Sequence, residues 1–261
     1  FLKNLLVAIV FSCLVFAPFK RKELAKLTKK QWFLLVLVGL VGGSIPFYLF
    51  FTGLQFVNPQ TANLIHKSLF IWVGLLAVIL LKEKLNLISI VAFILVFLGN
   101  YYFSRIPFAF GKGEMMIIVA TLFWSMESIL AKKVLAKVSS ELVGLFRMGL
   151  GSLVLLLTTF LTGRAGLFLN LDLQKLTIII VGGSILFGYV YFWFKALKYA
   201  PASLVALVLT FSVIVGNILN GTFAGVKILP KDIYSSLLIF AAVSLLTSQT
   251  LIKQGHSLNK K

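Results

Sequence analysis

The chain has 261 residues, of which 60% are hydrophobic and 12% are charged; its mean hydropathy is +1.03 and its net charge is +18. A soluble domain carries about a quarter charged residues, so this composition excludes a water-soluble protein and indicates one that folds in a lipid bilayer. The basic residues are spread over the loops between apolar runs, which argues against nucleic acid as a partner. The single Cys13 allows no intramolecular disulfide and no thiolate metal cluster.

A membrane-spanning helix needs about 20 mainly apolar residues, and the sequence contains nine candidate runs. These runs are residues 4–19, 32–54, 61–81, 85–104, 114–131, 142–162, 176–194, 201–224 and 233–252. The connections between them are mostly short, which leaves no room for a soluble domain. Because Phe1 is not a Met and lies next to an apolar run, we expect one further helix to precede it.

The basic residues also predict an orientation in the membrane. Six of them lie between the first two runs: Lys20, Arg21, Lys22, Lys26, Lys29 and Lys30. When the loops alternate between the two sides, sixteen Lys and Arg residues fall on this face and six on the other. An excess of positive charge marks the cytoplasmic face, so we expect a multi-pass cell-membrane protein with a cytoplasmic C-terminus.

Small residues and a proline lie near the middle of the run 32–54. Gly42, Gly43 and Ser44 let neighbouring helices approach closely, and Pro46 follows them. A proline has no N–H for the carbonyl four residues earlier, so that carbonyl needs a neighbouring helix, a water or a substrate. Asn58 is expected to cap the next helix.

Two short motifs occur twice along the chain. Residues 42–45 and 182–185 both read Gly-Gly-Ser-Ile, and residues 54–56 (Leu-Gln-Phe) match residues 197–199 (Leu-Lys-Tyr) at an offset of 143. A repeat of this length that contains several membrane-spanning runs is typical of carriers built from two related halves.

The loop charges predict that the second half is inverted. The offset of 143 pairs Lys84, on the cytoplasmic side, with Lys227, on the outer side. We expect an all-α polytopic membrane protein with two inverted-topology repeats of about five transmembrane helices, the first helix absent and nine present. The expected parts are a first repeat over 1–104, a linker over 105–113, a second repeat over 114–252 and a cytoplasmic tail over 253–261.

These features resemble the drug/metabolite transporter superfamily, within its EamA-type branch, over nearly the whole chain. Each repeat in this family tends to end its fourth helix in a Leu-x-Glu-x-Leu-like signature, here residues 81–85 (Leu-Lys-Glu-Lys-Leu). The segments 54–64 and 197–207 resemble the family's turn into that helix. The second repeat has Val226 at the position of Glu83. The resemblance implies a secondary carrier of small metabolites that works by alternating access.

Ionisable groups inside apolar runs are costly in hydrocarbon, so each needs a partner or an aqueous cavity. Asn63, Lys67, Phe70 and Gly74 follow helical spacing and would share one face. We expect this face to bind substrate, with Lys67 contacting an anionic group and the adjacent His66 accepting a proton. In the alternative, Lys67 extends its amine to the outer headgroups and His66 is structural.

Glu127 lies in the middle of the run 114–131, where a carboxylate is most costly. Two interpretations stay open. Either Glu127 alternates between a proton and a cationic group, such as a substrate or Lys67, or it forms a fixed ion pair with Arg147 in the next run. Trp124 is expected to line a cavity and stack on a substrate, with packing against lipid or helices as the alternative.

Further expectations concern Arg147, Glu83 and the polar residues near Glu127. Arg147 either pairs with Glu127 or reaches the cytoplasmic headgroups, and Glu83 ends its helix in a pair with Lys82 or Lys84. A stripe of polar residues at helical spacing accompanies Glu127: Thr121, Ser125, Ser128 and Lys132.

No enzyme motif, phosphate loop or zinc-binding His pair occurs in the sequence, and the two histidines are too few for a His-based metal site. We therefore expect no enzyme activity, no cofactor and no ATP-driven pump. With the resemblance, the expected function is secondary active transport of a small polar metabolite, an amino acid or related compound, with a proton as candidate coupling ion. The alternatives are a flippase for lipid-linked cargo and a non-transporting membrane assembly partner.

Overall fold

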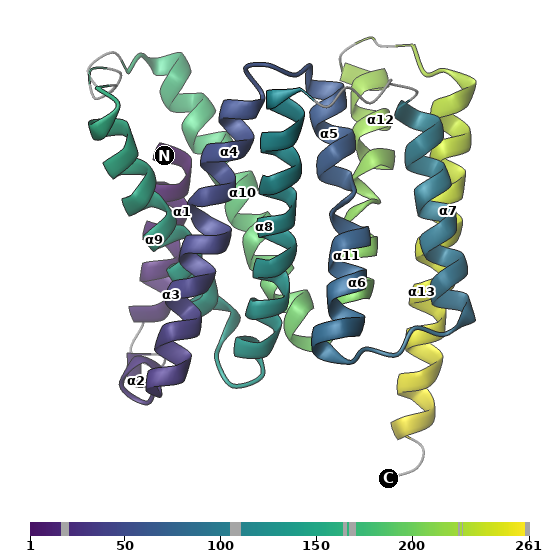
Figure 1. The fold of residues 1–261 in the computed structure, drawn as a ribbon, viewed down its shortest axis with the longest axis horizontal. Helices are drawn as coiled ribbons and strands as arrows, with labels where there is room; N and C mark the ends of the chain where they lie inside the picture. Colours follow the sequence, from purple (N-terminus) through teal and green to yellow (C-terminus); the bar gives the residue numbers. More distant parts are fainter. Residues whose placement is uncertain are drawn as a thin grey trace. The chain divides into compact units, whose positions relative to one another are not determined.

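The apolar runs of the sequence fold into α-helices. The computed structural model describes residues 1–16, 21–104, 111–163, 166, 171–223, 225 and 227–258, and no strand occurs among them. The helices are α1 (Leu2–Phe16), α2 (Arg21–Ala25), α3 (Lys29–Gly43), α4 (Ile45–Gly53), α5 (Pro59–Lys67), α6 (Leu69–Leu81), α7 (Leu87–Ser104), α8 (Lys112–Leu135), α9 (Ser140–Leu161), α10 (Leu173–Tyr199), α11 (Ala202–Leu209), α12 (Ser212–Phe223) and α13 (Pro230–Leu258) (Figure 1). The expected all-α fold is confirmed.

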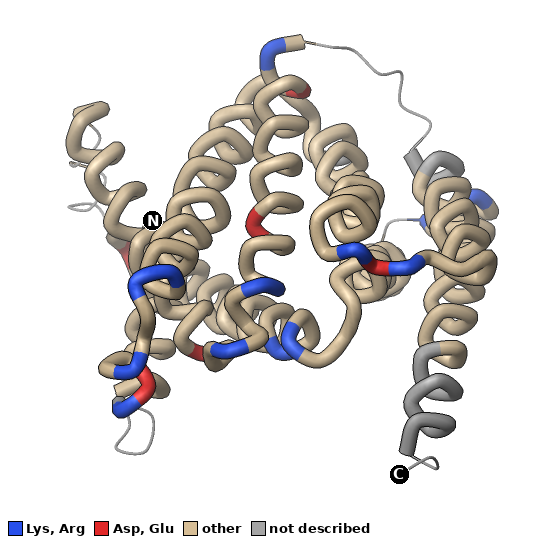
Figure 2. The backbone as a smooth tube through the Cα atoms, turned by 60° about the horizontal axis from the view of Figure 1, so that its bottom comes forward, with Lys and Arg blue, Asp and Glu red and all other residues tan. Residues whose placement is uncertain are grey.

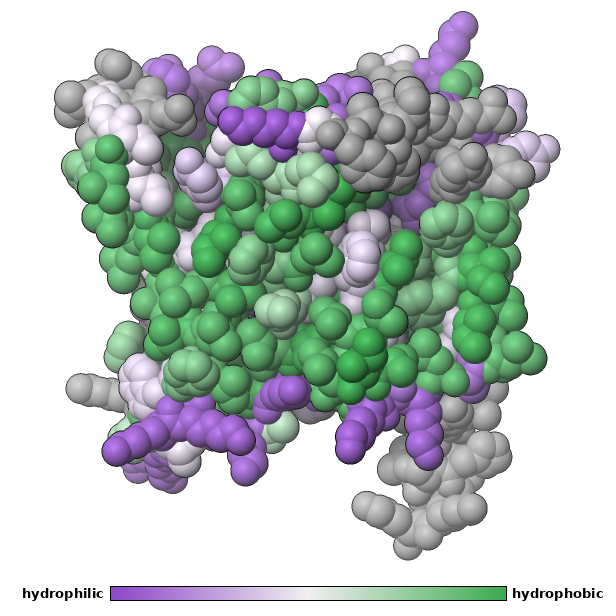
Figure 3. Space-filling model, viewed as in Figure 1, coloured by the Kyte–Doolittle hydropathy of each residue, from purple (hydrophilic) through white to green (hydrophobic). Residues whose placement is uncertain are grey.

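Among the described residues, nine apolar helical stretches occupy the nine predicted positions. Seven of these are long and apolar enough to cross a membrane: Lys29–Gly53, Thr61–Leu81, Lys112–Leu135, Ser140–Leu161, Leu173–Tyr199, Ala202–Phe223 and Pro230–Gln249. Leu2–Phe16 and Leu87–Asn100 are shorter apolar helices. Hydrophobic side chains cover the lengths of the helices on the face drawn in Figure 3, and hydrophilic ones gather at their ends, as expected of a multi-pass membrane protein.

Three of the spans are interrupted near their middle. The first break lies at Ser44, between α3 and α4 and two residues before Pro46. The second lies at Ser68, between α5 and α6, and it corrects the expectation of an uninterrupted helix over 61–81. The third lies at Thr210 and Phe211, between α11 and α12.

A side-chain hydroxyl group lies at each of the second and third breaks. Ser68 Oγ donates a hydrogen bond to the carbonyl of Ile65, and Thr210 Oγ1 donates one to the carbonyl of Leu207. Such bonds compete with the helical ladder and tighten the chain locally. Ser68 and Phe211 are 143 residues apart, which is the offset of the sequence repeat.

The chain forms two compact units, and each contains helices from both halves of the sequence. Unit 1 comprises Phe1–Gly53 and Met116–Ala200; unit 2 comprises Leu54–Met115 and Pro201–Lys261. The units therefore do not follow the two repeats, whose bounds remain a prediction. Residues 105–110 of the expected linker, residues 259–261 of the tail and Val226 lie outside the described residues.

In unit 1, α9 is the central packing element. It contacts α1, α3 and α10, and α1 also packs on α10. Fully buried side chains line these contacts, among them Phe11 of α1, Leu35 of α3 and Phe194 of α10. Transfer of one such side chain from water to an apolar environment contributes about 1.5–3 kcal/mol. In a bilayer, this free energy favours insertion of the helices, because lipid tails are as apolar as the side chains and add little to helix association.

In unit 2, α7 packs along α13 and α6 packs on α11. Asn58 Oδ1 accepts a hydrogen bond of 2.8 Å from the backbone N–H of Thr61, which confirms the predicted cap of α5. Lys and Arg, blue in Figure 2, and Asp and Glu, red, lie mostly at helix ends. This placement keeps most charges out of the apolar stretches.

Lys84 and Lys227 lie at opposite ends of the span formed by α11 and α12. Glu83, next to Lys84, bonds to the first residues of α11, and the chain then continues through α12 to Phe223, just before Lys227. We therefore expect Lys84→Cys and Lys227→Cys, each in a Cys13→Ser background, to react with a membrane-impermeant maleimide from opposite faces of the membrane. Both Lys side chains are exposed. Reaction of both from one face contradicts the inverted arrangement, and the Cys13→Ser protein alone is the blank.

Candidate functional site

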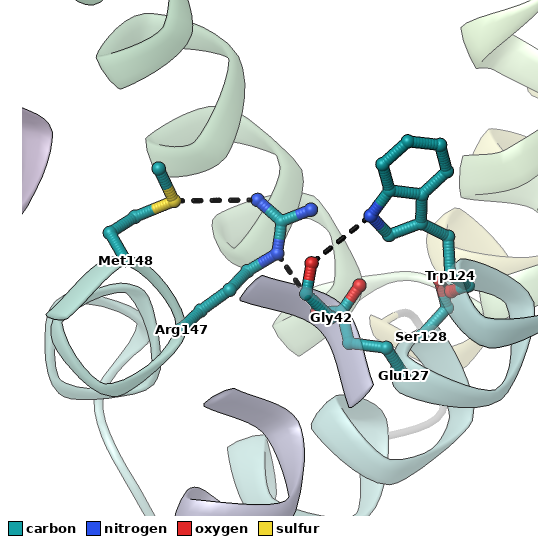
Figure 4. Close-up of polar contacts among 6 residues, drawn as sticks. All are labelled: Gly42, Trp124, Glu127, Ser128, Arg147 and Met148. Carbon is teal, nitrogen blue, oxygen red and sulfur yellow. Dashed lines mark hydrogen bonds and ion pairs between the residues drawn. The ribbon is translucent and has the colours of Figure 1, made fainter. Parts of the chain in front are cut away.

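The candidate site in unit 1 is built around a carbonyl group that the break in α3–α4 leaves without its helical partner. Pro46 has no N–H to offer to the carbonyl of Gly42, four residues earlier. Trp124 of α8 fills this gap: its indole Nε1–H donates a hydrogen bond of 3.0 Å to the Gly42 oxygen (Figure 4). The predicted need for an outside partner is met by a neighbouring helix, so Trp124 is buried with its polar atom engaged.

One turn along α8, Glu127 faces Arg147 of α9 (Figure 4). Arg147 Nε and Glu127 Oε1 are 3.5 Å apart, and the two side chains are only 5% and 2% exposed. Neither of these two atoms has a hydrogen-bond partner among the described residues, and Arg147 Nη1 lies 3.6 Å from the sulfur of Met148. The ion pair that the sequence left as one of two interpretations is therefore formed, with unused hydrogen-bonding capacity on both sides.

Aromatic rings surround the guanidinium group. Arg147 Cζ lies 5.6 Å from the ring centroid of Phe47 in α4 and 5.9 Å from that of Phe194 in α10. Trp124 meets Phe47 edge-on, with 5.4 Å between ring centroids. Cation–π contacts are strongest where water is excluded, so these rings stabilise the positive charge of Arg147. Sequence analysis missed Phe47 and Phe194, because nothing in one sequence reports which rings of several spans converge.

Two glycines allow the close approach of helices that the site requires. A Cβ atom on Gly42 would overlap the side chain of Glu127, and one on Gly43 would overlap the backbone carbonyl of Arg147. Gly151 of α9 faces Gly43 in the same way. The first Gly-Gly-Ser motif is therefore the contact surface on which the ion pair is placed, and its predicted role in close helix packing is confirmed.

The polar stripe on α8 is largely satisfied within its own helix. Thr121, Ser125 and Ser128 each donate a hydrogen bond of 2.8 Å to the carbonyl four residues earlier. Lys132 is different: its amine donates to the carbonyls of Leu197 and Ala200 at the end of α10. Lys132 is therefore the residue of the stripe that joins α8 to the end of α10.

In unit 2, the break at Ser68 separates the residues that were expected to share one face. Lys67 ends α5, and its amine donates a hydrogen bond to Ser212 Oγ at the start of α12. Asn63 is exposed, whereas Phe70 and Gly74 of α6 are buried. The expected four-residue face is therefore wrong, because the helix does not continue through Ser68. His66, part-buried, precedes Lys67 at the same break.

The pairing of Glu83 with its lysine neighbours, expected from the sequence, is also wrong. Its carboxylate accepts hydrogen bonds from the backbone N–H of Ala202 at 2.7 Å and of Ser203 at 3.2 Å, and from the Ser203 hydroxyl at 2.6 Å. Amides at a helix start are unpaired and carry partial positive charge, so they compete well with exposed lysines. Pro201 is the feature of the sequence that could have indicated this contact, because a proline side chain cannot cap α11 and the first N–H groups of that helix need another acceptor.

The described residues contain no group of three or more His, Cys, Asp or Glu side chains that could hold a metal ion. The chemistry available is therefore that of the charges and rings already named. Arg147 offers several N–H donors, Glu127 offers acceptor oxygens, and Phe47, Phe194 and Trp124 offer apolar faces. Together they offer one positive group, one negative group and apolar surface within unit 1.

Comparison with known proteins adds a family to this geometry. A sequence model of the family described as "EamA-like transporter family" matches residues 1–105 and 111–248. The chain is similar to "Uncharacterized transporter sll1164" from Synechocystis sp., with 29% identity over 160 residues, 57% of this chain and 46% of that protein. It is also similar to "Uncharacterized transporter YxxF" from Bacillus subtilis, with 27% identity over 188 residues, 68% of this chain and 57% of that protein.

A third relative, an "Uncharacterized transporter" from Methanothermobacter thermautotrophicus, is 26% identical over 151 residues, 55% of this chain and 44% of that protein. The chain spans about half the length of these relatives. A protein of known crystal structure has the same fold, with a TM-score of 0.76 over 95% of this chain and 86% of that one. At 15% identity, this likeness concerns the fold alone.

The close contact at Gly43 generates a stability prediction. Gly43→Ala should lower the thermal stability of the detergent-purified protein, because overpacking costs about 1–3 kcal/mol. Gly188→Ala is the matched control, since a Cβ there meets nothing within 4 Å. Alanine has the higher helix propensity, by about 0.5–1 kcal/mol, so this control should be neutral or slightly stabilising. Equal melting temperatures for the two variants contradict the contact.

The ion pair generates a double-mutant cycle. Glu127→Gln or Arg147→Met alone leaves one buried charge uncompensated, which costs about 3–5 kcal/mol. The double variant removes both charges and should lose much less stability than the sum of the two single losses. Unfolding of the purified protein by denaturant measures all four corners of the cycle. Additive losses would mean that the two side chains do not interact.

Proposed function

Because this chain belongs to the EamA-like transporter family, we propose that it is a secondary active transporter that moves a small polar metabolite across the cytoplasmic membrane by alternating access. The proposed substrate is an amino acid or a related compound. The observation that carries the proposal is the buried ion pair of Glu127 and Arg147 between apolar spans. A charge at this depth is costly, and in membrane proteins it marks a substrate or ion pathway.

The ion pair suits a substrate that carries both charges. A carboxylate can accept two N–H bonds from the guanidinium of Arg147, and an ammonium group can donate to the carboxylate of Glu127. The present contact of 3.5 Å uses neither atom in a hydrogen bond. A bound zwitterion would therefore exchange one incomplete contact for two complete ones, while the surrounding rings accept its apolar part.

The same pair supports proton coupling. A proton on Glu127 neutralises the carboxylate and ends its attraction to Arg147, so protonation and the ion pair are alternative states of one group. Which of them prevails then depends on the proton concentration on the side to which the group is open. We propose Glu127 as the residue that carries a coupling proton.

Unit 2 offers a second binding group. Lys67 ends α5 at a break in the span, and interrupted spans in secondary transporters are typical of binding sites. We propose that Lys67 exchanges its hydrogen bond to Ser212 for an anionic substrate group, with His66 and Asn63 on the same short helix. The face with most Lys and Arg is proposed to be cytoplasmic, together with the C-terminus.

Uptake by the complete protein in proteoliposomes tests this function. A panel of metabolites is offered with and without a pH gradient, and amino acids should be taken up faster when the gradient is present. Glu127→Gln and Lys67→Met should each lower uptake about ten- to a hundredfold, the effect of losing about 1.5–3 kcal/mol from a charge-assisted contact.

The controls remove charges of the same type away from the candidate site. Lys175→Met removes an exposed charge that pairs with Asp172, and Glu114→Gln removes a part-buried one in the first turn of α8; both should transport normally. Each uptake rate is divided by the amount of folded protein, which is measured by size-exclusion chromatography. Normal uptake by Glu127→Gln and Lys67→Met refutes the assigned residues, and uptake of none of the metabolites leaves a flippase or an assembly partner as the better account.

A further inference from the structure

The two Gly-Gly-Ser-Ile motifs of the sequence both lie in unit 1, and each borders an ionisable side chain of another helix. In the first motif, a Cβ atom on Gly42 would overlap the side chain of Glu127. In the second motif, which lies in α10, a Cβ atom on Gly182 would lie 3.0 Å from Lys3 Cδ, closer than side chains normally approach. The first motif thus makes room for the ion pair, and the second makes room for Lys3 of α1.

Lys3 is a cation without an anionic partner in the chain. Among the residues that the structure describes, its amine forms no ion pair and no hydrogen bond, and it lies 5.8 Å from the ring centroid of Phe51 in α4. Both side chains are exposed, Phe51 to 50%. A positive charge on an apolar helix needs a partner or an aqueous space, so Lys3 is available to an anionic group of a ligand.

Two stacked rings connect Lys3 to the ion pair. Phe51 stacks on Phe47, one turn earlier in α4, with 6.2 Å between ring centroids and 20° between ring planes. Phe47 in turn lies 5.6 Å from Arg147 Cζ. The stack therefore has a cation at each end: the exposed Lys3 at the last turn of α4, and the buried Arg147 one turn further in.

The direction of the Lys3 side chain distinguishes it from a lysine that only anchors a helix. Such a lysine extends past the end of its own helix to the lipid headgroups. The side chain of Lys3 instead passes Gly182 of α10 and places its amine over a ring of α4, so it is directed to neighbouring helices of unit 1.

This arrangement suits a zwitterion that moves along α4. Its carboxylate can be held first by Lys3 and then by Arg147, because both are hydrogen-bond donors with a positive charge. Its ammonium group and apolar part can lie on the faces of Phe51 and Phe47, since the face of an aromatic ring attracts positive charge.

We propose that Lys3 is a further substrate-binding residue of unit 1, which receives the carboxylate of the substrate at the last turn of α4 before Arg147 binds it. This Lys3 subsite rests on the proposed function and adds a first binding step to it. A cation at the mouth of a site raises the local concentration of anionic groups. Its loss therefore raises the KM, whereas the maximal rate depends on the inner ion pair and stays nearly unchanged.

Uptake kinetics in proteoliposomes test the Lys3 subsite, with the amino acid that the metabolite panel shows to be taken up fastest as the probe. Lys3→Gln should raise the KM about tenfold and change the maximal rate less than about twofold. Lys3→Arg keeps the charge and should keep the KM within about twofold of the unmodified protein. Lys175→Gln, which removes an exposed charge at the start of α10, is the matched control and should change neither quantity.

Charged thiol reagents test the position of Lys3 without any substrate. Phe51→Cys in a Cys13→Ser background places a thiol where the ring under the Lys3 amine lies. Its rates of reaction with an anionic methanethiosulfonate (the ethylsulfonate) and a cationic one (the ethyltrimethylammonium) are compared. The charge of Lys3 favours the anionic reagent, so Lys3→Gln should lower the anionic-to-cationic rate ratio about tenfold. Lys175→Gln should leave this ratio unchanged.

The two readouts separate this proposal from the proposed function. An unchanged rate ratio, or a thiol at position 51 that reacts with neither reagent, overturns the Lys3 subsite, whatever the uptake assay gives. A lowered ratio with an unchanged KM also overturns it, because the charge then acts near Phe51 without binding the substrate. A lowered ratio together with no uptake of any metabolite supports an anion-attracting group at this position and counts against the transporter function.

Discussion

The hydrocarbon core gives no water to an unpaired polar group, and this constraint governs how the candidate site is built. Pro46 removes the N–H that the Gly42 carbonyl requires, and Trp124 of another helix supplies the replacement. That bond places α8 against α3, and it brings Glu127 to Arg147 on the next helix. The glycines then follow by necessity, because a side chain at Gly42 would occupy the space of Glu127. One missing N–H thus orders the residues around the ion pair.

The same constraint at the ends of helices is met by charges from distant parts of the chain. Glu23 accepts the N–H of Ser139 at the start of α9 at 2.6 Å, Glu83 does so at α11, and Lys132 serves the carbonyls at the end of α10. A charge near a helix terminus contributes typically about 0.3–1 kcal/mol, and more when partly buried. Because each of these charges comes from another element, the same bond that caps a helix also fixes tertiary structure. Charges at the ends of the helices therefore do more in this protein than orient it in the membrane.

The sequence was informative where a property is local. Apolar length predicted the nine helical stretches, Pro46 predicted a carbonyl in need of an outside partner, and Asn58 predicted the cap of α5, because each depends on residues that are contiguous in the sequence. It failed at Ser68, where the helix is interrupted within an apolar run without Gly or Pro; the Ser68 hydroxyl there bonds to the carbonyl of Ile65. It also failed at Glu83, whose partners are 119 and 120 residues away. Glu127 lies between these cases. The sequence showed that a carboxylate in an apolar run needs a partner, but it left open whether that partner was Arg147 or a proton and a cationic group in turn.

The two interrupted spans of unit 2 show what the repeat preserved and what it changed. Their breaks at Ser68 and Phe211 keep the offset of 143 residues, although the hydroxyl groups that lie at them differ in position by one residue. The caps at their starts do not correspond: one is the local Asn58, the other the distant Glu83. Both spans therefore share an interruption at equivalent positions. Their starts differ, because a local cap ties α5 to nothing else, whereas Glu83 ties the start of α11 to the end of α6.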